Sequence, residues 1–150
     1  MTPKDTHLDL IRLMLKGDAE TYRERCAELD QGRWEGFGLV VSAAFYIAVQ
    51  EKFGESWATA DVIDFVAEAR KNIQHTSSEI NPTVAEVLIL AALTGNTGEM
   101  EKLETGVIVE AEMLLIWNLL GSISDGELEE FLIRSGALAQ QWNEEEEIPA

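Results

Sequence analysis

The sequence contains a single cysteine, Cys26, and only two histidines, His7 and His75. One cysteine cannot form an intramolecular disulfide, which suits a reducing compartment, so we expect a cytoplasmic protein. Two histidines are too few for a histidine-rich zinc site, and neither completes the Glu-x-x-His motif of a di-iron bundle. We therefore expect no metal and no cofactor, with Cys26 in the core and both histidines at the surface.

Basic residues are also scarce, because 11 Lys and Arg face 28 Asp and Glu, which gives a formal net charge of −17. Proteins that bind nucleic acids need a basic face, so we expect no nucleic-acid partner. No apolar run approaches the roughly 20 residues needed to span a bilayer. The first residues lack the apolar core of a signal peptide, and we expect no membrane partner.

Apolar residues are abundant, at 46% of the chain, and they recur with a helical period almost everywhere. This pattern predicts an all-α fold, a single-domain bundle of about six to seven helices with short glycine-capped turns. The helical domain is expected over residues 1–143. Residues 144–150, which begin with four glutamates, are expected to form an acidic flexible tail.

Capping signals and glycines predict where the helices begin and end. Thr2 is the expected N-cap of the first helix, which Gly17 ends, and Asp18 is expected to cap the second. Two helices joined so tightly should form an antiparallel helical hairpin. Two later helices are expected to begin at capping boxes, one formed by Thr83 with Glu86 and the other by Ser124 with Glu127.

Three segments, 37–49, 84–93 and 107–120, are apolar on nearly every side. A domain of this size has too little interior to bury all three segments completely. A dimer interface would cover the apolar surface that remains. A homo-oligomeric structural protein, such as a homodimer, is therefore one alternative for the function.

Residues 99–120 are expected to form one long helix, although Val107-Ile108-Val109 is β-branched and resembles a short strand. The helical spacing of the apolar side chains favours the helix. The expected buried stripe comprises Met100, Leu103, Val107, Ala111, Leu114 and Trp117. Trp34 and Trp142 are likewise expected to pack in the core.

Glu110 and Glu112 interrupt this apolar segment. Residues two positions apart on a helix point about 200° from each other, so at least one of these carboxylates should reach solvent. We expect both to be exposed, because glutamate is rarely buried. The alternative is that one lines an internal cavity or a subunit interface and meets a cation there. A small-ligand pocket or an enzyme inside the bundle, built around Glu110 or Glu112, is the function that this alternative would allow.

No catalytic or nucleotide-binding motif is present. Residues 124–132 resemble the second half of a calcium-binding EF-hand loop, but aligning Gly126 with the loop glycine puts Gly121, Ile123 and Leu132 at ligand positions. The chain has no P-loop, and Gly36-Phe-Gly38 lacks the third glycine of a dinucleotide-binding turn. We therefore expect a protein that is not an enzyme, without catalytic residues.

Charge is distributed unevenly along the sequence, with a net of −4 over residues 1–75 and −13 over residues 76–150. Between Lys102 and Arg134 no basic residue occurs, whereas seven acids do: Glu104, Glu110, Glu112, Asp125, Glu127, Glu129 and Glu130. Such a segment favours a non-enzymatic interaction module of the inhibitor type that binds a basic protein partner through these seven residues. The simpler alternative is acidity for solubility alone.

Overall fold

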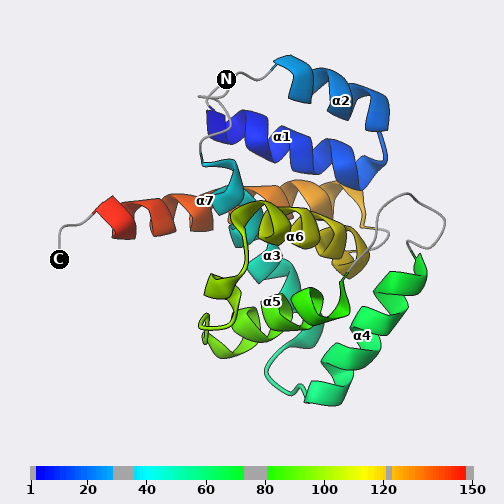
Figure 1. Ribbon diagram of the computed structural model, residues 1–150. Helices are drawn as coiled ribbons and strands as arrows, with labels where there is room; N and C mark the ends of the chain where they lie inside the picture. The colour runs from blue at the N-terminus through cyan, green and yellow to red at the C-terminus, as the bar shows by residue number, and fades with distance from the viewer. Residues whose placement is uncertain (1–2, 29–35, 73–80, 121–122, 148–150) are drawn as a thin grey trace. The chain divides into compact units, whose positions relative to one another are not determined.

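The computed structural model describes residues 3–28, 36–72, 81–120 and 123–147 (Figure 1). All secondary structure in these ranges is helical, which confirms the predicted all-α class with about seven helices. The elements are α1 (Pro3–Lys16), α2 (Ala19–Glu28), α3 (Phe37–Phe53), α4 (Thr59–Asn72), α5 (Pro82–Thr94), the 3-10 turn η2 (Met100–Lys102), α6 (Thr105–Leu120) and α7 (Asp125–Glu147). None of the helices in the described ranges combines the length and apolar character that crossing a membrane requires.

The chain divides into two compact units. Unit 1 comprises residues 1–47 and 122–150, and so contains α1, α2, α7 and the first part of α3. Unit 2 comprises residues 48–121, with the end of α3 and all of α4, α5, η2 and α6. That residues 1–143 fold as a single domain stays a prediction.

The expected helical hairpin is present in unit 1, where α1 and α2 pack side by side (Figure 1). Gly17 ends α1 with a left-handed φ of 75°, and its amide donates to the carbonyl of Met14. Asp18 caps α2, because its side chain accepts from the Thr21 amide at 3.1 Å. Thr2, the predicted cap of α1, lies outside the described residues.

His7 is buried in unit 1, with 1% of its surface exposed, and its ring packs edge-on against Phe37 at 5.3 Å between centroids. The expectation of a surface histidine is wrong here. His7 precedes the fully buried Leu10 and Ile11 by three and four residues, so the three side chains share one face of α1. His75 lies outside the described residues.

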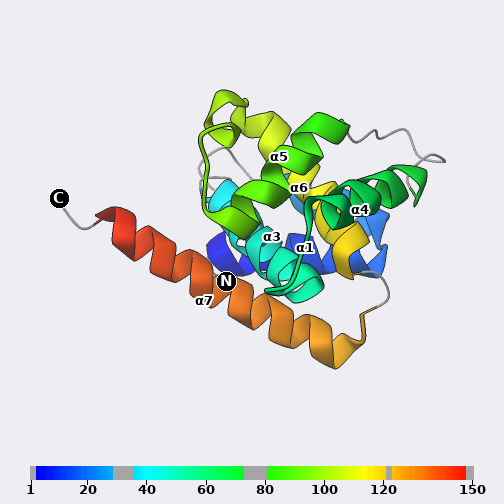
Figure 2. The same cartoon turned by 90° about the horizontal axis from the view of Figure 1, so that it is seen from below.

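Figure 2 shows the long helix α7. It begins at the predicted capping box. The Glu127 amide donates to Ser124 Oγ at 3.2 Å, and Ser124 Oγ donates to Glu127 Oε1 at 2.9 Å. Its predicted apolar stripe is largely buried, at Leu128, Phe131, Leu132 and Ser135, whereas Leu138 and Trp142 are partly exposed. The helix continues to Glu147, past the predicted domain boundary at residue 143, because glutamate has a high helix propensity.

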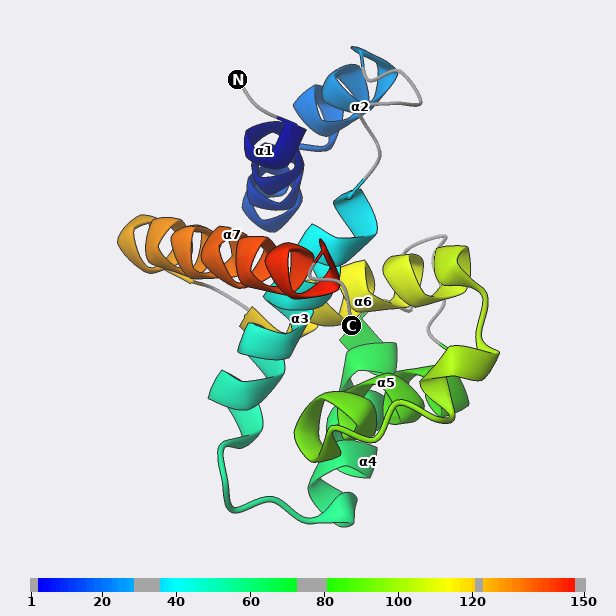
Figure 3. The ribbon, with the colours of Figure 1, turned by 90° about the vertical axis from the view of Figure 1, so that its left-hand side faces the viewer.

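In unit 2, α5 packs against both α4 and α6 (Figure 3). The predicted capping box of Thr83 with Glu86 is wrong, because Asn81 is the N-cap and accepts from the amides of Thr83 and Val84. Pro82 then occupies the first helical position, where its missing N–H leaves no internal bond unmade. Gly95 ends α5 with a φ of 78°, and its amide donates to the Ala91 carbonyl.

The predicted single helix over 99–120 is interrupted. Leu103 adopts an extended conformation after η2, and α6 begins only at Thr105. Thr105 and Gly106 both have low helix propensity, so little opposes a break at this point. The β-branched residues 107–109 are helical, as predicted.

The three segments expected to be buried on nearly every side differ in outcome. Within 37–49 only Tyr46 is exposed, and within 84–93 no residue is exposed. Within 107–120, however, Val107 and Trp117 are 41% and 40% exposed, so the prediction that they belong to the core is wrong. The helix is apolar on several sides, and its sequence does not mark which side its neighbours cover.

Candidate functional site

The seven acids predicted to bind a partner are divided between the two units. Unit 2 contains Glu104, Glu110 and Glu112, on α6 or directly before it, and unit 1 contains Asp125, Glu127, Glu129 and Glu130, in the first two turns of α7. The seven acids therefore form two groups, one in each unit.

The net charge is shared almost equally between the units. Unit 1 has 16 acidic and seven basic residues, a net of −9, and unit 2 has 12 acidic and four basic residues, a net of −8. The division arises because α7, from the acidic half of the sequence, packs against α1 from the other half. The steep asymmetry along the sequence is therefore not an asymmetry between compact units.

On α7, the side chains of Asp125, Glu127 and Glu130 are exposed. Glu127 is held in place by the hydroxyl of Ser124, so its carboxylate has a defined position at the start of the helix. Neither Asp125 nor Glu130 forms an ion pair with another described residue. These two carboxylates face solvent.

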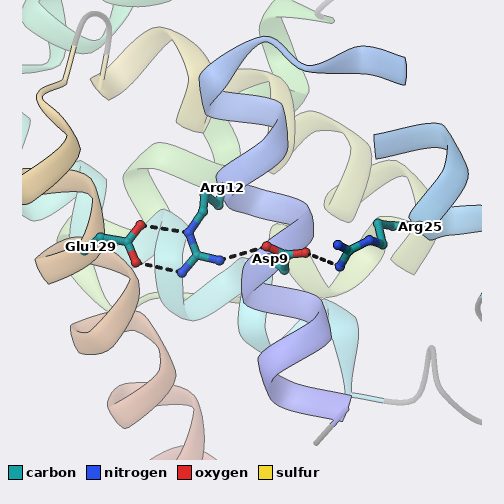
Figure 4. Close-up of polar contacts among 4 residues, drawn as sticks. All are labelled: Asp9, Arg12, Arg25 and Glu129. Atoms are coloured by element: carbon teal, nitrogen blue, oxygen red, sulfur yellow. Dashed lines mark hydrogen bonds and ion pairs between the residues drawn. The ribbon is translucent and has the colours of Figure 1, made fainter. Parts of the chain in front are cut away.

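Glu129 differs from its neighbours because it belongs to a chain of four charged side chains that links α7, α1 and α2 (Figure 4). Arg12 binds its carboxylate with two parallel hydrogen bonds, Nε to Oε2 at 2.7 Å and Nη2 to Oε1 at 2.8 Å. The third nitrogen of Arg12 donates to Asp9 at 2.8 Å, and Arg25 donates to the other oxygen of Asp9 at 2.5 Å.

This chain stabilises the charged forms of Arg12 and Glu129. The hydrogen bonds from Arg12 lower the pKa of Glu129, and those to Glu129 raise the pKa of Arg12. The four side chains together are electrically neutral, so Glu129 contributes less to the outward field than its neighbours on α7. A partner that bound Glu129 would have to displace Arg12.

In unit 2, Glu104 and Glu110 are exposed, whereas Glu112 is only 3% exposed. The prediction that at least one of Glu110 and Glu112 reaches solvent is confirmed, but the expectation that both do is wrong. Their angular separation on α6 places one on the exposed side and the other on the buried side. The two carboxylates therefore do not converge on one ligand.

Cys26 is half-buried rather than in the core, one helical turn after Tyr22 on α2. Burial raises the pKa of the Cys26 thiol, although a hydrogen bond with Tyr22 opposes the shift. Burial and the neighbouring cysteine raise the pKa of Tyr22 to about 12. Both groups are thus protonated at neutral pH, and a protonated thiol is a weak nucleophile.

Within the described ranges, no three His, Cys, Asp or Glu side chains lie close enough together to hold a metal ion.

Sequence reasoning missed one surface feature on α6. Val107, Glu110, Leu114 and Trp117 follow one another at helical spacing and form a stripe that is exposed at three positions and partly exposed at Leu114. We call these four residues the α6 stripe. The available signal was the excess of apolar residues around this helix, which is more than one buried face needs.

Comparison of the chain with protein-family models, curated proteins and solved structures found no match.

Proposed function

We propose that the protein is a non-enzymatic interaction module that binds a basic protein partner through exposed carboxylates. The observation that carries the proposal is that five of the seven predicted acids are exposed and form no ion pair with another described residue. They are Glu104 and Glu110 in unit 2, and Asp125, Glu127 and Glu130 in unit 1. Exposed charges of one sign attract a partner of opposite sign and accelerate its association by about 10- to 1,000-fold.

The basic residues strengthen the proposal through the contacts they make. Arg12, Arg25 and Lys102 each pair with carboxylates of the same unit. Their positive charge is therefore balanced locally, by Asp9 and Glu129 in unit 1 and by Glu99 in unit 2. The net charge of both units is negative, which favours a cationic protein surface as the ligand.

The test is capture of the partner by the immobilised full chain, with washes from about 0.05 to 0.5 M salt, over which the Debye length shortens severalfold. Bound proteins are identified by mass spectrometry. We expect a basic protein that is retained at low salt and released as the salt rises. An acidic partner, or a partner whose retention does not change with salt concentration, would contradict the proposal.

Charge-neutralising variants distinguish binding through particular carboxylates from acidity that serves solubility alone. Glu104→Gln/Glu110→Gln removes two charges from unit 2, and Asp125→Asn/Glu130→Gln removes two from unit 1. The matched control is Glu20→Gln/Glu24→Gln, which removes two exposed charges from α2. At least one of the first two variants should lose the partner at a lower salt concentration than the control does. Equal losses in all three would indicate acidity for solubility alone.

A further inference from the structure

The α6 stripe combines apolar surface with negative charge. Val107 and Trp117 expose 41% and 40% of their surface, and the partly exposed Leu114 lies between them. The exposed Glu110 lies in the same stripe, three residues after Val107. Spacings of three, four and three residues keep all four side chains on one side of the helix.

The helix that carries this stripe is fixed within unit 2. Its other sides are buried at Ala111, Leu115 and Ile116, and α6 packs against α5 and α4. At its C-terminal end, Asn72 of α4 donates to the Asn118 side chain at 3.2 Å, and Asn118 donates to the Leu114 carbonyl at 2.9 Å. A ligand would therefore meet a surface that is already formed, which lowers the entropic cost of binding.

The charge around the stripe indicates the kind of occupant. Glu110 lies within it and the exposed Glu104 lies one turn before it, while no basic residue occurs between Lys102 and Arg134. A second copy of this chain would bring a further net charge of −17 against these carboxylates. Like charges repel across an interface, whereas a cationic ligand gains from the same groups.

We propose that the α6 stripe binds a basic amphipathic helix of a partner protein. Apolar side chains of that helix contact Val107, Leu114 and Trp117, and its Lys or Arg residues pair with Glu110 and Glu104. Tryptophan is among the side chains that most often dominate binding energy. The stripe extends from Val107 to Trp117, which is about 15 Å along the helix and matches about three turns of a partner helix. This inference rests on the proposed function and names its surface and its ligand.

The test uses two synthetic peptides of identical Leu and Lys composition. In one, the leucines follow helical spacing on a single face, and in the other the order is permuted so that no such face forms. Binding to the full chain is measured by calorimetry at about 0.15 M salt, where long-range attraction is screened. We expect the amphipathic peptide to bind at least about tenfold more tightly than the permuted one, since only it presents an apolar face.

Variants locate the site. Trp117→Ala should weaken binding of the amphipathic peptide at least about tenfold, as loss of an aromatic anchor does. Val107→Lys should weaken it further by placing a cation in the stripe. The control Ile63→Ala truncates a side chain on α4 that is 50% exposed in the same unit, and should change affinity less than about twofold. Circular dichroism checks that each variant is folded. If the Trp117→Ala variant does not fold, Val107→Lys serves as the test.

Three results would overturn the inference: equal binding of both peptides, unchanged binding by the folded stripe variants, or a dimer of the chain in light scattering that Trp117→Ala dissociates. A basic partner could still be captured by the Trp117→Ala and Glu110→Gln variants and be lost only with Asp125→Asn/Glu130→Gln. That result would refute the inference and leave the proposed function standing. Failure of the full chain to retain any basic partner at low salt would refute the proposed function itself.

Discussion

Arg12 on α1 binds Glu129 on α7 through two parallel hydrogen bonds of 2.7 and 2.8 Å, although the two residues lie 117 positions apart in the sequence. A guanidinium group that holds both carboxylate oxygens fixes the orientation as well as the distance of its partner. Because Arg12 also binds Asp9, which binds Arg25, the contact joins three helices of unit 1. It is a bidentate polar contact between α7 and the helical hairpin.

We predict that the Arg12–Glu129 pair contributes measurably to the stability of the protein. A double-mutant cycle with Arg12→Ala and Glu129→Ala should give a coupling energy of about 0.5–1 kcal/mol, near the top of the range for surface pairs, because the contact is bidentate and part of a network. The free energies come from urea unfolding. The Lys102–Glu99 pair is the control, because its side chains are 71% and 73% exposed. A cycle at that pair with a coupling as large as that of Arg12–Glu129 would contradict the prediction.

The same pair should make stability depend on pH in a defined direction. Arg12 lowers the pKa of Glu129 below its ordinary value of 4.5, so the folded protein holds this proton less tightly than the unfolded chain does. The stabilisation is therefore complete above about pH 5 and is lost as the pH falls through the lowered pKa. The difference in unfolding free energy between the wild type and Glu129→Gln should be constant from pH 5 to 7 and shrink below pH 4. A difference that grows on acidification would contradict this sign.

Local chemistry explains which parts of the fold could be predicted from sequence. Gly17, Asp18 and the Ser124–Glu127 box act within one helical turn, and each was identified correctly. The start of α5 was placed two residues late, because the box at Thr83 and the N-cap at Asn81 are both plausible in sequence. Pro82 decides between them, since proline fits the first helical turn and a cap at Thr83 would leave it outside the helix.

Alanine substitutions test this correction directly. Asn81→Ala should lower the unfolding free energy by about 1 kcal/mol, because the amides of Thr83 and Val84 lose their acceptor. Thr83→Ala should change it by less than about 0.5 kcal/mol, as expected for an exposed residue that does not cap the helix. Urea unfolding measures both variants. A larger loss for Thr83→Ala would restore the original prediction.

Tyr22 should titrate with a pKa of about 12. The chain has two tyrosines, so the Tyr46→Phe variant leaves Tyr22 as the only one. Ultraviolet absorbance then follows formation of the phenolate as the pH rises. Adding Cys26→Ala should lower the pKa of Tyr22 only in part, because burial is the largest cause of the shift and the cysteine is secondary. If the pKa of Tyr22 returned fully to its ordinary value in the double variant, the cysteine and not burial would be the main cause of the shift.

Contacts between distant segments explain what could not be predicted. Sequence alone does not show which of 28 acidic residues Arg12 would meet, and so Glu129 was grouped with carboxylates that face solvent. The position of His7 in the first turn of α1 suggests a surface residue, but its spacing from Leu10 and Ile11 puts it on their buried face, and the spacing decides. On α6 the spacing itself was uninformative, since apolar residues occur on both the buried and the exposed sides.

Glu110 and Glu112 provide the sharpest test of which side of α6 is buried. Glu112→Ala should lower the unfolding free energy by at least about 2 kcal/mol, because it removes a large side chain that is 97% buried and leaves a cavity. Glu110→Ala should change it by less than about 0.5 kcal/mol, as an exposed substitution does. Glu112→Gln keeps the volume and replaces the carboxyl group with an amide, so it should cost less than Glu112→Ala if filling the space matters most. Equal values for the two alanine variants would mean that the buried side of α6 has been assigned wrongly, and the exposure of Val107 and Trp117 would then have to be reconsidered with it.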